Sequence, residues 1–76
     1  MSALGMDKEQ AISLWICQVI SAIKEDFGVS IDDFLRMDLQ HNIVGWLYEN
    51  YEILHYDAQH LAAEEVLQRV AGRGGL

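Results

Sequence analysis

Three histidines, at positions 41, 55 and 60, are the most chemically versatile side chains of this 76-residue sequence. His55 and His60 flank Asp57, so two imidazoles and a carboxylate lie close together in the chain. These groups can bind zinc, but metal-binding histidines on one helical face are spaced i, i+4, and these two are further apart. We therefore expect no metal site, and we interpret His55 and Asp57 as a structural corner. There the ring binds either a backbone carbonyl or the Asp57 carboxylate.

The remaining reactive side chains do not form a catalytic pattern. Glu64 and Glu65 are neighbours on a predicted helix and point in different directions, and Asp32 and Asp33 belong to the first turn of another helix. No serine has a histidine nearby in the sequence. Cys17 is the single cysteine, which excludes an internal disulfide, and its apolar neighbours predict a packed thiol. We therefore expect a protein that is not an enzyme and holds no cofactor.

Aromatic residues are concentrated in one short segment, where Trp46, Tyr48 and Tyr51 lie within six positions. These positions cover more of a helix than one buried stripe, so some of the rings should reach the surface. Tyrosine and tryptophan are preferred anchors of protein interfaces. The alternative interpretation is core packing with the polar tips in water.

The net charge of −7 is also concentrated there, since residues 30–57 carry six acidic side chains and one basic side chain. This segment is either an ordinary solvated surface or an acidic face that binds a basic partner. The second interpretation predicts a partner surface, which consists of Asp38, Trp46, Tyr48, Glu49 and Glu52.

The same charge argues against two other kinds of partner. Nucleic acids and anionic membranes both require a basic face, so we expect neither. No apolar run approaches the roughly 20 residues that span a bilayer, and the N-terminus lacks the basic region of a signal peptide. We expect a cytoplasmic protein, whose natural start is either Met1 or Met6.

Apolar residues that recur every three or four positions predict an all-α fold, a single domain over 1–76 with three to four helices. The predicted helices span about 7–27, 31–38, 40–55 and 58–71, with frayed tails at 1–5 and 72–76. The expected core residues are Ile12, Trp15, Ile16, Val19, Ile20, Ile23, Phe27, Ile31, Phe34, Leu35, Met37, Ile43, Leu47, Tyr51, Leu54, Ala62, Val66 and Val70.

Capping residues mark several of the predicted helix ends. Gly28 is the expected left-handed cap of the first helix, and Ser30 opens the second with Asp33 as its capping-box partner. Asp57 is the expected N-cap of the last helix. Gly45 lies inside the predicted third helix, which indicates either a close helix crossing or a helix that begins only near that position.

The end of the third predicted helix resembles a family of small bacterial proteins of unknown function. The residues that carry the resemblance are Tyr51, Glu52, Ile53, Leu54 and His55. The family has a similar order of helices and is often encoded beside a predicted ADP-ribosyltransferase-like toxin. The resemblance thus implies an antitoxin or accessory role.

These observations favour a small acidic helical module that binds a basic protein partner, with the toxin of the resembled family as one such partner. The alternative is a structural homodimer, because a chain of this length has a thin core and an excess of large apolar residues. Both interpretations can hold together if dimerisation uses the first helix and the partner binds the third. Metal or small-ligand binding through His55, Asp57 and His60 is the weakest alternative.

Overall fold

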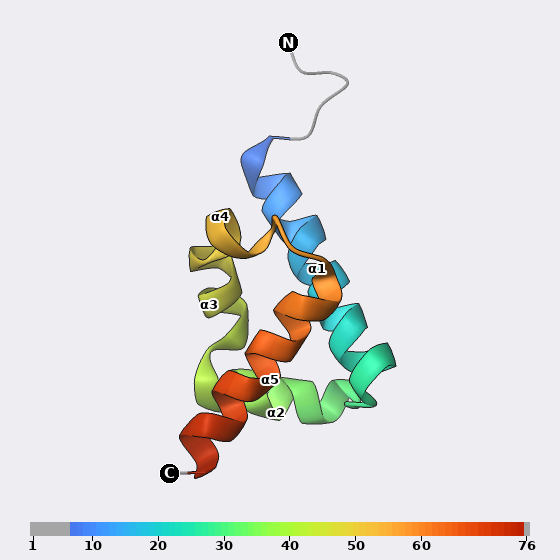
Figure 1. Cartoon of the computed structure of the whole chain (residues 1–76), viewed down its shortest axis with the longest axis vertical. Coiled ribbons are helices and arrows are strands. Elements are labelled where there is room, and N and C mark those ends of the chain that lie inside the picture. Colours follow the sequence, from blue (N-terminus) through green and yellow to red (C-terminus); the bar gives the residue numbers. More distant parts are fainter. Residues whose placement is uncertain (1–6, 76) are drawn as a thin grey trace.

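The computed structural model describes residues 7–75, with side chains up to Gly72, and consists of helices joined by short turns (Figure 1). The helices are α1 (Lys8–Phe27), α2 (Ile31–His41), α3 (Ile43–Glu49), α4 (Tyr51–Leu54) and α5 (Gln59–Gly75). The described residues form no strand, so the predicted all-α class is confirmed. None of these helices combines the length and the apolar character that crossing a membrane requires.

The prediction of one long helix over 40–55 is wrong. The helix α2 continues to His41, and Asn42 then takes a left-handed conformation with φ of 52°, which ends the helix. The next helix starts at Ile43 and is itself broken at Asn50. Gly45 therefore lies in the first turn of α3, as the second interpretation of that glycine requires.

The other helix limits agree better with the sequence. The first helix has nearly its predicted length and ends at Gly28 with φ of 70°. The last helix starts at Gln59 and continues to Gly75, so the tail predicted at 72–76 is helical up to residue 75. The tail predicted at 1–5 lies outside the described residues.

Side chains cap the first two helices. Asp7 and Gln10 form a capping box in which Asp7 Oδ1 accepts from the Gln10 amide at 2.8 Å. Ser30 Oγ accepts from the Asp33 amide at 3.1 Å, which confirms the predicted N-cap. The predicted capping box at Ser30 is wrong, because the Asp33 carboxylate lies 3.5 Å from Arg36 Nη1 instead. This i, i+3 pair uses the carboxylate that would otherwise reach back to the cap.

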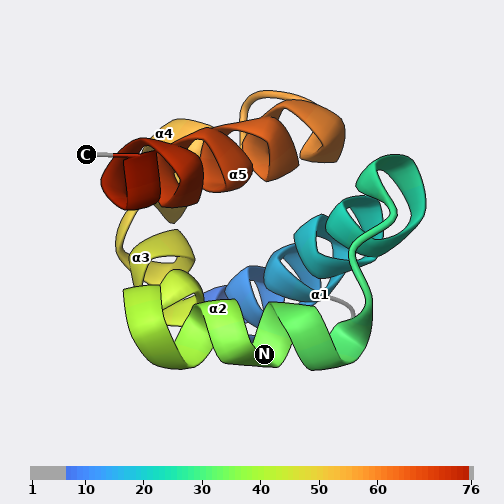
Figure 2. The same ribbon diagram turned by 90° about the horizontal axis from the view of Figure 1, so that it is seen from below.

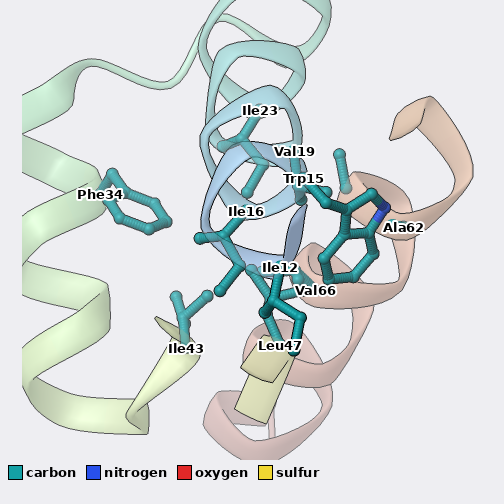
Figure 3. Close-up of a cluster of buried hydrophobic side chains, with 11 residues drawn as sticks. Ile12, Trp15, Ile16, Val19, Ile23, Phe34, Ile43, Leu47, Ala62 and Val66 are labelled. Atoms are coloured by element: carbon teal, nitrogen blue, oxygen red, sulfur yellow. The ribbon is translucent and has the colours of Figure 1, made fainter. Parts of the chain in front are cut away.

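The core surrounds α1, with α2 on one side of it and α5 on the other (Figure 3). The buried side chains are Ile12, Trp15, Ile16, Val19, Ile23, Phe34, Ile43, Leu47, Ala62, Ala63 and Val66. The helices α3 and α5 both pack against α1 and cover its apolar stripe. The expected core positions Phe27, Ile31 and Leu35 are exposed.

Candidate partner-binding groove

Two of the five predicted partner-surface residues have other roles in the structure. Asp38 Oδ1 accepts a hydrogen bond from the Val44 amide at 2.8 Å, so it caps the start of α3 from the last turns of α2. This bond supplies the acceptor that the left-handed Asn42 does not provide, since Asn42 makes no side-chain cap bond. Asp38 is therefore a structural residue, and its assignment to the partner surface is not supported.

Trp46 is turned toward α5. Its ring packs against the core and lies beneath the guanidinium carbon of Arg69, 5.0 Å from the ring centroid. The half-buried indole thus carries a cation–π contact within the chain. This contact leaves Trp46 outside the surface that the other predicted residues form.

The other three residues of the predicted surface come together, and the start of α1 completes the site. They line an open groove of about 390 Å³ between α1 and the α3–α4 segment. We call it the acidic groove, and its lining residues are Lys8, Glu9, Ile12, Tyr48, Glu49, Tyr51 and Glu52. Figure 1 shows α3 and α4 beside the N-terminal half of α1, which is the arrangement that creates the groove.

Two polar contacts connect the walls of the acidic groove. The Tyr48 hydroxyl donates a hydrogen bond to the Glu9 carboxylate, and the Lys8 ammonium pairs with the Glu52 carboxylate. The bond to Glu9 raises the pKa of Tyr48, because it stabilises the neutral phenol. The hydrogen bond from Lys8 lowers the pKa of Glu52, and the same bond raises the pKa of Lys8.

The groove carries excess negative charge. Three carboxylates face one ammonium group, and Glu49 has no ion-pair partner among the described residues. Tyr48 keeps 43% of its surface exposed beside these carboxylates. A guanidinium or ammonium group entering the groove would meet a free carboxylate together with an accessible aromatic ring.

Aromatic rings connect the floor of the groove to the core. Tyr51 meets Trp15 edge to face, with ring centroids 5.3 Å apart and an interplanar angle of 78°. The opposite contact of Tyr51 is a stack on His55 at 4.2 Å, and His55 in turn contacts the exposed ring of Tyr56. Trp15 and His55 therefore hold Tyr51, a lining residue of the groove, from two sides.

His55 has the structural role that the sequence predicts. Its Nδ1 donates to the Tyr51 carbonyl at 2.6 Å, so of the two predicted partners the ring binds the backbone. The prediction that Asp57 is the N-cap of the last helix is wrong, since Ala58 is the residue directly before α5. The amides of Leu61 and Ala62 bond to the Ala58 carbonyl.

The histidines do not converge on a metal site. His60 Nδ1 lies 3.0 Å from Asp26 Oδ2, and its ring stacks on Phe27 with centroids 5.0 Å apart, whereas the His55 ring binds the Tyr51 carbonyl. Among residues 7–72 no three side chains of the metal-ligating types come together.

A second, larger hollow of about 530 Å³ lies between the C-terminal half of α1 and the first turn of α5. It contains Cys17, which is exposed, so the predicted packed thiol is wrong. His60 and Asp26 lie in the same hollow. Nine residues of helix separate Cys17 from Asp26, about 13 Å along the axis, so the thiol does not lie beside the imidazole. The hollow therefore does not assemble a nucleophile with a base.

Sequence reasoning missed Lys8, Glu9 and Ile12 as groove residues. Their types are ordinary for the first turns of an amphipathic helix, so no local pattern distinguishes them. Only the docking of α3 against α1 brings them next to Tyr48 and Glu52.

No family model, curated protein or solved structure matches this chain. The resemblance of residues 51–55 to the toxin-associated family therefore stays a hypothesis. The function has to be argued from the acidic groove itself.

Proposed function

We propose that the chain is a small cytoplasmic protein-interaction module that binds a basic segment of a partner protein in the acidic groove. The proposal includes no catalytic step and no cofactor. The observation that carries it is the position of Glu49, an exposed carboxylate without an ion-pair partner among the described residues, beside the accessible ring of Tyr48.

An arginine side chain of the partner suits this groove best. Its planar guanidinium can bind the Glu49 carboxylate through two parallel hydrogen bonds while it stacks on Tyr48. Ile53, which is 72% exposed, and the exposed Tyr56 follow Glu52 closely in the chain and supply apolar surface. The fitting partner is therefore a segment that carries both arginine and large apolar side chains.

The charge of the whole protein supports the same kind of partner. A net charge of −7 on 76 residues attracts a cationic surface over several ångströms. This attraction increases the association rate more than the final affinity, and it weakens with salt.

The resemblance of residues 51–55 supplies the first natural partner to test, an ADP-ribosyltransferase-like toxin encoded by a neighbouring gene. An enzyme that binds a phosphate-rich substrate needs cationic side chains at its site. An acidic module that covers such a site would block the substrate, which is how an antitoxin would act.

A labelled peptide tests the groove without knowledge of the natural partner. The probe is a synthetic helical peptide with alternating arginine and leucine faces, titrated by fluorescence anisotropy in moderate salt. Glu49→Lys leaves the Lys8–Glu52 pair in place. It should weaken binding by roughly tenfold, as the loss of one charge-assisted contact does.

Glu64→Lys is the matched control, because Glu64 is exposed on α5 outside the acidic groove and the change in net charge is the same. We expect its dissociation constant to stay within about twofold of that of the wild-type chain. Equal weakening by both variants would show that only the overall charge attracts the peptide, and the proposed site would be rejected. Far-UV circular dichroism of both variants verifies the fold.

A further inference from the structure

The outer face of α2 carries an apolar row that the chain itself does not cover. Ile31, Leu35 and Leu39 follow one another at i, i+4 spacing and are 49%, 52% and 86% exposed. The inner face of the same helix is packed, since Phe34 is buried and Met37 is half-buried against the core. In Figure 2 α2 runs along one edge of the molecule, on the opposite side from α5.

We infer that this row is the contact surface of a homodimer, in which α2 pairs with α2 of a second copy in antiparallel orientation around Leu35. In this arrangement a two-fold axis passes beside the two Leu35 side chains. Ile31 and Leu39 are both four residues from Leu35, about 6 Å along the helix axis. Each Ile31 therefore lies level with Leu39 of the second copy, and the two Leu35 side chains face each other. The apolar row is thus complementary to a second copy of itself.

The local charge pattern on one flank of the row is self-complementary, which favours a second copy as the occupant. Asp32 and Arg36 lie one turn apart on the same flank of the apolar row, and both are exposed. In the single chain Arg36 Nη1 lies 3.5 Å from Asp33, and this exposed contact would be exchanged for one with Asp32 of the second copy. A two-fold axis perpendicular to the helices keeps this flank on the same side of both copies and reverses its direction. Measured along the helix axis, the Asp32 position of one copy then lies about 3 Å from the Arg36 position of the other. The flanks form two symmetric ion pairs.

The expected dimer is weak and reversible. A helix of 11 residues is about 16 Å long, which is less than the side of a standard protein interface. The contact uses no residue of the acidic groove, which is formed by α1, α3 and α4. Dimerisation through α2 thus leaves the groove open, and each copy presents one groove to a partner.

Sedimentation equilibrium over a dilution series to about 1 mM tests the inference. The wild-type chain should show concentration-dependent mass between one and two copies of 8.6 kDa. Leu35→Glu places two carboxylates at the axis and should give a monomer at every concentration. Leu14→Glu changes an equally exposed leucine on α1 and should leave the association unchanged. A wild-type monomer over the whole series overturns the inference.

A charge exchange tests the antiparallel register. Asp32→Arg and Arg36→Asp should each be monomeric alone, because each variant places like charges opposite one another. An equimolar mixture should associate again, since its mixed dimer restores both ion pairs. Association of the separate variants, or a mixture that stays monomeric, overturns the register. Thermal melts verify that both variants fold, and the peptide titration of Glu49→Lys stays independent of all these outcomes.

Discussion

Tyr48 of α3 donates a hydrogen bond to the carboxylate of Glu9 in α1, across 39 residues of sequence. Lys8 and Glu52 make a second contact across the same boundary. Ile12 lines the acidic groove, and its side chain is buried in the core. The acidic groove therefore results from the docking of α1 on the α3–α4 segment. Its two polar contacts exist only while these elements are docked, so their loss would show that the elements have separated.

The bond between Tyr48 and Glu9 predicts a pH dependence in alkali. Because the pKa of Tyr48 is raised in the folded chain, its stabilising contribution is complete below the unfolded pKa and is lost as pH rises through the folded value. Absorbance at 295 nm should show a tyrosine, Tyr48, that ionises above its ordinary pKa. In Glu9→Ala this ionisation should move to lower pH. An unchanged titration in this variant would contradict the hydrogen bond.

Asp38 predicts a loss of stability without a loss of binding. Asp38→Ala removes the acceptor of the Val44 amide and should reduce the free energy of unfolding by about 1 kcal/mol, as the loss of an N-terminal cap does. Urea denaturation measures this change. Asp38→Asn keeps an oxygen acceptor and should retain most of the stability. If Asp38→Ala instead weakened the basic peptide without destabilising the fold, Asp38 would belong to the partner surface after all.

Gly45 predicts a coupling with Asn42. A Cβ atom at position 45 would lie 2.5 Å from Asn42 Nδ2, so the substitution displaces the Asn42 side chain. Gly45→Ala alone should therefore give little or none of the roughly 1 kcal/mol that alanine gains over glycine in a helix. In the Asn42→Gly background the contact is absent, and the full gain should appear in thermal unfolding. The same gain in both backgrounds would contradict the close contact.

The sequence predicted the helices where the apolar period and the caps agree. The first helix has a continuous stripe from Ile12 to Ile23 and a glycine directly after its end, and both features are local. The junction at Asn42 was predicted a few residues too early, near residue 39. The break at Asn50 was missed because Leu47, Tyr51 and Leu54 keep a helical spacing across it, so the period alone shows no break. Left-handed Asn42 and the distant cap from Asp38 depend on contacts six residues apart.

The candidate site was predicted only in part for a related reason. Tyr48, Glu49 and Glu52 stand out in sequence as an aromatic and acidic cluster, and the structure does group them. Trp46 belongs to the same sequence cluster but lies on another side of α3, facing Arg69. Lys8 and Glu9 join the groove through tertiary docking, which a single sequence does not encode in any short pattern.

Exposed apolar residues are a second limit of periodicity. Ile31 and Leu35 have the spacing of core residues, yet only Phe34 of their helix is buried. A period shows that residues share a face, and it does not show whether the chain covers that face or leaves it for another molecule.

Amide chemical-shift mapping with the arginine–leucine peptide tests the central claim most directly. On titration into the ¹⁵N-labelled chain, the largest shift changes should occur at Glu9, Tyr48, Glu49 and Glu52, with little change at Glu64 and Glu65. The changes should shrink in Glu49→Lys and at higher salt. Shift changes centred on α5 or spread evenly over the surface would contradict the acidic groove as the binding site.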